Sequence, residues 1–111
     1  HQSLTEIIMV ETMHQRKEIM YQRSQAFVVL PGGFGTMDEM FEIITWKQLL
    51  LHDKPIVIVN NQGYWDHLVA LMHNIIDQRF AAEEVRGYFE VVPDVDGLME
   101  TLARSVPQTV K

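Results

Sequence analysis

Residues 26–39, AFVVLPGGFGTMDE, decide the fold of this 111-residue chain. Five consecutive apolar residues, 26–30, predict a short strand that is buried on both faces of a sheet. A glycine-rich turn at 31–35 follows the strand and leads into an apolar helix predicted over residues 36–51. A buried strand that passes through a glycine turn into a helix is typical of an α/β domain with a parallel sheet.

The alternation of strands and helices continues on both sides of this stretch. Further strands are predicted at 7–10, 55–60 and 89–92, and further helices at 13–24, 64–79, 82–87 and 94–104. This order predicts an α/β fold in three layers, a parallel sheet with helices on both faces and right-handed crossovers. Four strands are few for a complete doubly wound domain. We therefore expect N-terminal strands to be missing from this chain, and the chain to be a piece of a longer protein.

The composition excludes several classes of function. Nine Lys and Arg against 15 Asp and Glu give a net charge of −6, which repels a phosphate backbone, so we expect no nucleic-acid partner. The chain has no cysteine, which excludes disulfides, thiolate metal sites and a cysteine nucleophile. Its five histidines lack a metal-binding spacing, so we expect no metal. No apolar run approaches the ~20 residues of a membrane span, and the expected location is the cytoplasm.

The glycine turn is the strongest candidate for a binding site. Gly32, Gly33 and Gly35 allow close approach of a ligand, and the helix that follows offers free N–H groups to a phosphate. The spacing matches neither a Walker loop nor the dinucleotide fingerprint. A structural alternative is a capping box, in which Thr36 caps the helix and Glu39 reaches back to the Thr36 N–H.

A second candidate is the basic pair Arg16 and Lys17, early in the helix predicted after the first strand. Helix starts that follow parallel strands share one edge of the sheet, so this pair is expected near the glycine turn. Cations are unfavourable at a helix N-terminus, and a bound anion at that edge would explain them. The alternative is a solvated pair on the surface.

Taken together, these segments resemble the LOG family. The resemblance rests on MHQRK (13–17) and PGGFGTMDE (31–39), and it extends through FEIITW (41–46), HDKP (52–55) and GYWD (63–66). It covers essentially the whole chain. Members of the family are cytokinin riboside 5′-monophosphate phosphoribohydrolases, historically mislabelled "lysine decarboxylase". The resemblance identifies residues 1–111 as the C-terminal portion of one Rossmann-like domain, whose N-terminal half carries further nucleotide contacts.

The resemblance implies hydrolysis of the N-glycosidic bond of a purine nucleoside 5′-monophosphate, without a cofactor. The positions of Arg16 and Glu39 are the essential ones in the family. Other positions contact the nucleotide in the family, and they correspond here to Lys17, Gly32, Gly33, Gly35, Thr36 and Thr45. A carboxylate suits this chemistry because the sugar passes through an oxocarbenium-like state. We assign that role to Glu39.

Three points stay open at the level of sequence. Thr45 lies six residues after Glu39, about 240° around a helix, so it acts either across the homodimer interface of the family or only in helix packing. A protein of this fold could also bind a nucleotide or the molybdenum cofactor without catalysis. A decarboxylase would need pyridoxal phosphate on a lysine, and none of the four lysines has a convincing context for that.

Overall fold

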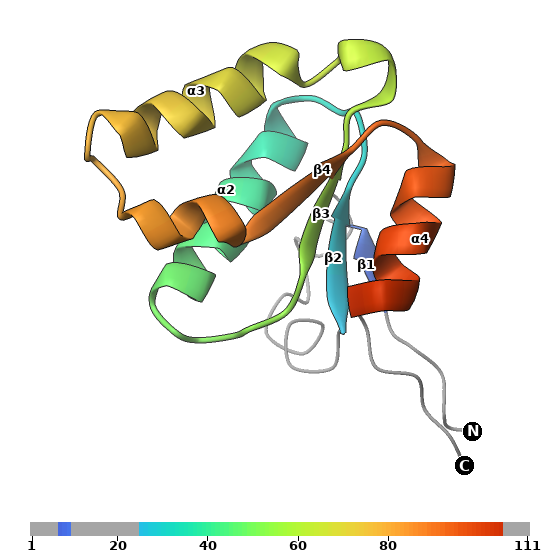
Figure 1. Cartoon of the computed structure of the whole chain (residues 1–111), viewed down its shortest axis with the longest axis horizontal. Helices are drawn as coiled ribbons and strands as arrows, with labels where there is room; N and C mark the ends of the chain where they lie inside the picture. The colour runs from blue at the N-terminus through green and yellow to red at the C-terminus, as the bar shows by residue number, and fades with distance from the viewer. Residues whose placement is uncertain (1–6, 10–24, 106–111) are drawn as a thin grey trace.

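A parallel sheet of four strands forms the centre of the molecule (Figure 1). The computed structural model describes residues 7–9 and 25–105. The described strands are β1 (Ile7–Met9), β2 (Ala26–Val29), β3 (Ile56–Val59) and β4 (Phe89–Val92), in spatial order β1-β2-β3-β4. Each neighbouring pair is parallel. The predicted parallel sheet is confirmed, and its strands end within one residue of the predicted limits.

Helices cover both faces of the sheet, as predicted. They are α2 (Phe34–Gln48), α3 (Asp66–Asp77) and α4 (Val95–Ser105), with short 3₁₀ helices η2 (Asn61–Gly63) and η3 (Glu83–Gly87). Figure 1 shows α2 and α3 on one side of the strands and α4 on the other. The helix predicted at residues 13–24 lies outside the described residues. The three-layer arrangement is that of a Rossmann-like α/β fold.

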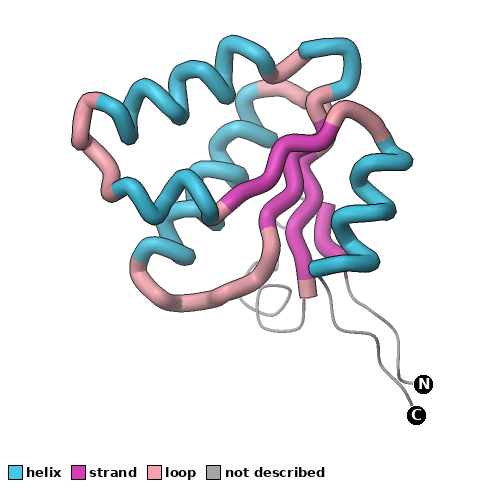
Figure 2. The backbone as a smooth tube through the Cα atoms, viewed as in Figure 1, coloured by secondary structure: helices cyan, strands magenta, loops and turns pink. Residues whose placement is uncertain are grey.

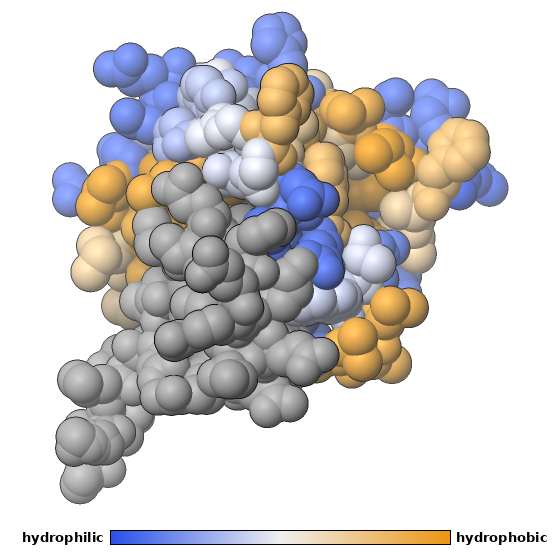
Figure 3. All heavy atoms as spheres, turned by 180° about the vertical axis from the view of Figure 1, so that it is seen from behind, coloured by the Kyte–Doolittle hydropathy of each residue, from blue (hydrophilic) through white to orange (hydrophobic). Residues whose placement is uncertain are grey.

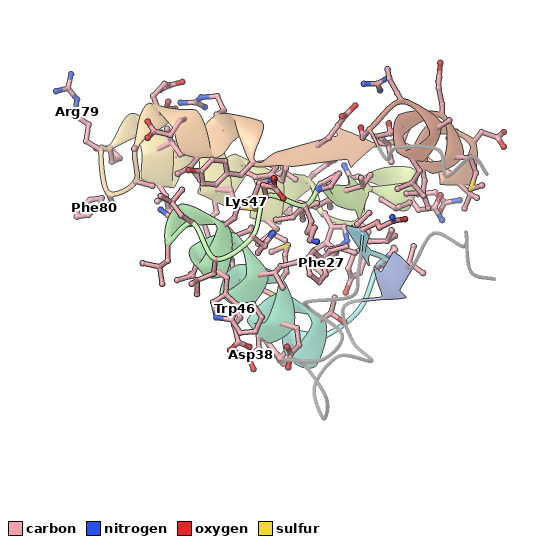
Figure 4. The ribbon with its side chains drawn as sticks, turned by 90° about the horizontal axis from the view of Figure 1, so that it is seen from below. Phe27, Asp38, Trp46, Lys47, Arg79 and Phe80 are labelled. Atoms are coloured by element: carbon pink, nitrogen blue, oxygen red, sulfur yellow. The ribbon has the colours of Figure 1, made fainter. Side chains whose placement is uncertain are left out.

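The alternating side chains of the strands build two separate apolar layers. Phe27 and Val29 of β2 point to the layer under α2 and α3, where Met40 and Ile43 of α2 are fully buried. Figure 4 shows Phe27 between its strand and α2. Val28 points to the other layer, against α4. Because successive residues of a strand face opposite sides, a strand covered on both faces must be apolar throughout, which explains the run at 26–29.

Both ends of α2 differ from the prediction. The helix begins at Phe34, with Gly33 as its N-cap and no side-chain cap, so Thr36 lies inside the first turn. The capping box is therefore wrong: Gly33 takes the extended N-cap conformation and the helix starts within the glycine turn. At the other end, α2 stops at Gln48 instead of residue 51, because Leu50 adopts a left-handed conformation with φ 62°.

The loops that follow the strands lie at one edge of the sheet. Figure 2 shows the segments after β2, β3 and β4 together at the end of the strands where the glycine turn lies. We call this the carboxyl edge, and the end where β3 and β4 begin the amino edge. Ligands of parallel α/β proteins bind at the carboxyl edge. None of the described helices has the length and apolarity that crossing a membrane requires.

Candidate functional site

The glycine turn leaves the carboxyl end of β2 and passes directly into α2. The first helical hydrogen bond of α2 runs from the N–H of Met37 to the carbonyl oxygen of Gly33, at 3.1 Å. The N–H groups of Phe34, Gly35 and Thr36 precede it, and helix geometry gives them no partner within the helix. These groups carry the partial positive charge of the helix start. The turn can therefore bind a phosphate, as its sequence predicts.

The glycines of the turn have different physical reasons to be glycine. A Cβ added to Gly32 would lie 2.3 Å from Oγ1 of Thr36, so the side chain of Thr36 occupies the space beside Gly32. A Cβ at Gly33 or Gly35 would meet nothing within 4 Å among the described residues. Gly32 thus serves close packing inside the turn, whereas Gly33 and Gly35 leave room on its surface. The missing side chains let a ligand reach the backbone at those two positions.

Glu39 and Thr36 lie on the buried side of α2, next to the turn. Their exposed fractions are 2% and 5%, and they continue the stripe formed by Met40 and Ile43 towards the helix start. Among residues 25–105, Glu39 is the one carboxylate that is buried. Burial of a carboxylate is costly, and such groups are concentrated at functional sites. The structure therefore places the predicted carboxylate on the buried side of α2, six residues after Gly33.

The loop after β3 contributes a residue that sequence reasoning did not assign to the site. The hydroxyl of Tyr64 donates a hydrogen bond to the carbonyl oxygen of Gly32, at 2.5 Å. Tyr64 stands in the GYWD segment, which supported the family resemblance without being given a role. Its place directly after the turn that follows a strand was the available signal, because such loops meet at one edge of a parallel sheet.

Thr45 lies away from the glycine turn. It is exposed, and it borders an apolar cavity of about 120 Å³ between α2 and α3, together with Phe41 and Ile75. Nine residues of helix separate it from Thr36, about 13 Å along the axis. Within the described residues the structure does not bring Thr45 to Glu39, and its contact with a nucleotide stays a prediction. Arg16 and Lys17 lie outside the described residues.

Lys47 lies at the amino edge, far from the glycine turn. Its Nζ donates hydrogen bonds to the carbonyl oxygens of Lys54 (2.7 Å) and Tyr88 (3.0 Å), and it lies 5.6 Å from the centre of the Tyr88 ring. Burial lowers the pKa of Lys47, and nearby Asp53 opposes this effect. An amine held by two backbone carbonyls fastens α2 to the starts of β3 and β4. It does not fit a Schiff-base lysine for pyridoxal phosphate.

His52 is a second ionisable group at the amino edge, and it is buried. Its Nδ1 accepts a hydrogen bond from the N–H of Lys54 at 3.0 Å, so the proton of the neutral ring is on Nε2. Nε2 then donates to the carbonyl oxygen of Ile43 at 2.8 Å. Burial lowers the pKa of His52 and favours this neutral form. The His52 ring therefore links α2, at the carbonyl of Ile43, to the backbone of Lys54 just before β3. Among residues 25–105 no three His, Asp or Glu side chains form a metal-binding group.

Comparisons with known proteins place this chain in a family. The model of the family described as "Possible lysine decarboxylase" matches residues 1–102. The chain is 38% identical over 107 residues to "Cytokinin riboside 5'-monophosphate phosphoribohydrolase LOG2" of Arabidopsis thaliana, covering 96% of the chain and 50% of that protein.

Two further relatives agree with this match. "Cytokinin riboside 5'-monophosphate phosphoribohydrolase LOG1" of Arabidopsis thaliana is 36% identical over 110 residues, with 99% of the chain and 52% of the relative covered. "Probable cytokinin riboside 5'-monophosphate phosphoribohydrolase LOGL9" of Oryza sativa subsp. japonica is 40% identical over 106 residues, with 96% and 47% covered. The chain thus spans about half the length of these relatives.

Proposed function

We propose that the protein containing this chain is a nucleoside 5′-monophosphate phosphoribohydrolase. The chain belongs to the LOG family, whose model carries the description "Possible lysine decarboxylase". The substrate class is a purine nucleoside 5′-monophosphate, with adenine or an N6-prenylated adenine as the base. The observation that carries the proposal is Glu39, a buried carboxylate in α2 six residues after Gly33. The names of the relatives support the same activity.

The proposed reaction replaces the bond between the base and C1′ of ribose. Water attacks C1′, its oxygen stays on the sugar, and the base leaves with the bonding electrons and takes up a proton. The products are the free base and ribose 5-phosphate. The carboxylate of Glu39 stabilises the positive charge that develops on the sugar, or orients the attacking water.

The phosphate of the substrate binds at the glycine turn. The N–H groups at the start of α2 and the hydroxyl of Thr36 are its proposed donors. Arg16 positions the nucleotide and assists departure of the base, and Lys17 contacts the nucleotide. Both roles follow from the family resemblance, and both residues lie outside the described part of the chain.

We also propose that the protein acts as a homodimer in the cytoplasm, with Thr45 reaching the nucleotide bound by the partner. Exposed leucines support an apolar contact beyond the end of α2, since Leu49, Leu50 and Leu51 are 62%, 86% and 54% exposed. Figure 3 shows several apolar patches, separated by polar residues, on the face opposite to that of Figure 1. Light scattering of the protein, with Leu50→Glu as a variant, tests the dimer. A monomeric wild type would contradict it.

Release of the free base tests the activity. The full-length protein is supplied with AMP and N6-isopentenyl-AMP, and with the two dephosphorylated nucleosides as controls. We expect release from the monophosphates alone, and the faster of the two identifies the preferred base. Glu39→Gln should reduce kcat by about 10²- to 10⁴-fold and keep affinity for AMP.

The matched control is Glu100→Gln, because Glu100 is an exposed carboxylate on α4, on the other face of the sheet. It should leave base release unchanged. A wild-type protein that binds AMP and releases no base from any of the four compounds would contradict the proposed hydrolase. That result would favour a non-catalytic nucleotide or molybdenum-cofactor carrier instead.

A further inference from the structure

The hydrogen bond from Tyr64 connects two loops that are far apart in the sequence. The hydroxyl group comes from the loop between β3 and α3, and its acceptor is the carbonyl oxygen of Gly32, 32 residues earlier. Tyr64 is 54% exposed, so its ring contributes little to the core. The contact is therefore made at the surface of the carboxyl edge, where the phosphate is proposed to bind.

The direction of the Gly32 carbonyl decides the direction of the next N–H. In a planar trans peptide the C=O of one residue and the N–H of the next point in opposite directions. Because the Gly32 carbonyl points to Tyr64, the N–H of Gly33 points away from Tyr64. A flip of this peptide would present the carbonyl oxygen in place of the N–H, and its partial negative charge would repel a phosphate. Glycine has no side chain to resist such a flip.

The loop that carries Tyr64 is itself held by side-chain contacts. Asn60 donates to Oδ1 of Asp66 at 2.7 Å and accepts from the N–H of Trp65 at 2.5 Å. Gly63 has φ 75°, and a Cβ at Gly63 would lie 2.7 Å from Oδ2 of Asp66. These contacts on both sides of Tyr64 fix the backbone from which its ring projects. The hydroxyl is thus supplied by a rigid frame.

We propose that Tyr64 is a positioning residue that aims the N–H of Gly33 at the phosphate of the substrate. The inference rests on the proposed function, because it assigns the glycine turn to a phosphate. The side chain of Thr36 supports the same orientation of the Gly32 peptide, because it packs beside Gly32: a Cβ added to Gly32 would lie 2.3 Å from Oγ1 of Thr36. Tyr64 itself does not touch the ligand. Its effect passes through one peptide bond.

Kinetics of Tyr64→Phe test the inference. Loss of one hydrogen bond should raise KM for AMP, and the inhibition constant of ribose 5-phosphate, by about fivefold. The value of kcat should stay within about twofold, since binding of the phosphate is equally strong in the ground state and the transition state. Tyr88→Phe is the matched control at the amino edge and should change neither constant. Unchanged constants in Tyr64→Phe, or a loss confined to kcat, would overturn the inference.

A second measurement does not depend on activity. In NMR spectra of the wild type, addition of inorganic phosphate should shift the amide proton of Gly33, and this shift should be smaller in Tyr64→Phe. An unshifted Gly33 amide at saturating phosphate would overturn the inference. The two failures are distinguishable: a wild type that releases no base contradicts the proposed function, whereas an active wild type with a normal Tyr64→Phe variant contradicts only the role of Tyr64.

Discussion

The two edges of the sheet use polar groups in opposite ways. At the amino edge, Lys47 is half-buried and His52 is buried, and both are hydrogen-bonded to backbone groups. At the carboxyl edge, the first N–H groups of α2 have no partner within the helix, and a Cβ added to Gly33 or Gly35 would meet nothing within 4 Å among the described residues. The side chains of the amino edge therefore bond to their own backbone, whereas the first N–H groups of α2 at the carboxyl edge are left without a partner in their helix.

Residue type alone therefore does not identify a functional group. Lysine and histidine are the side chains most often expected in an active site, yet here their polar atoms fasten α2 to β3 and β4. Glycine carries no charge, yet the exposed Gly33 and Gly35 stand where we propose that the phosphate binds. The hydrogen-bond partners of each group decide which edge is structural and which can act on a substrate.

Among the variants that test the difference between the two edges, Lys47→Met should have the largest effect on stability. Lys47→Met keeps the apolar stem and removes the amine, which leaves the carbonyl oxygens of Lys54 and Tyr88 without their donor. We expect the free energy of unfolding to fall by about 2–3 kcal/mol. Urea denaturation measures the change, and KM for AMP should stay the same.

The control for this variant is Lys54→Met, because the side chain of Lys54 makes none of these bonds and its carbonyl stays in place. It should change stability far less. Equal losses of stability in the two variants would show that the amine of Lys47 does not stabilise the amino edge.

A smaller effect on stability is expected from substitution of the glycines at the carboxyl edge. Gly32→Ala places a Cβ against the side chain of Thr36, so we expect a loss of about 1–2 kcal/mol in stability and weaker binding of AMP. Gly35→Ala adds a methyl group in open space on a helix, so stability should rise by up to about 1 kcal/mol while AMP binding falls. Thermal unfolding and calorimetry measure both. Improved AMP binding by Gly35→Ala would contradict a ligand at this surface.

The smallest expected effect is a dependence of stability on pH, which comes from His52 at the amino edge. Burial holds the pKa of His52 below its ordinary 6.5, so the unfolded chain takes up the proton first as the pH falls. The contribution of His52 is complete above about pH 6.5 and is lost as the pH falls below that value. Urea denaturation between pH 7.5 and 5 should show this slope, and His52→Gln should reduce it. An identical slope in the variant would assign the dependence to other groups.

The candidate site was partly predictable from local sequence. The apolar run at 26–29, followed by glycines and a helix, identified both the strand and the turn that leads into α2, because each depends on neighbouring residues only. The capping box at Thr36 and Glu39 was wrong for a related reason. The pattern of threonine and glutamate fits a cap, but Gly33 takes the extended N-cap conformation, and the helix begins at Phe34, two residues before the predicted start.

The order of strands and helices and the burial of the sheet on both faces could be predicted from the sequence alone. Periodicity and spacing are properties of neighbouring residues, so they can be read along the chain. The hydrogen bond from Tyr64 to Gly32 and the one from Lys47 to Tyr88 could be found only in the folded chain. The two bonds join residues 32 and 41 positions apart, and such contacts depend on how the loops meet at each edge of the sheet.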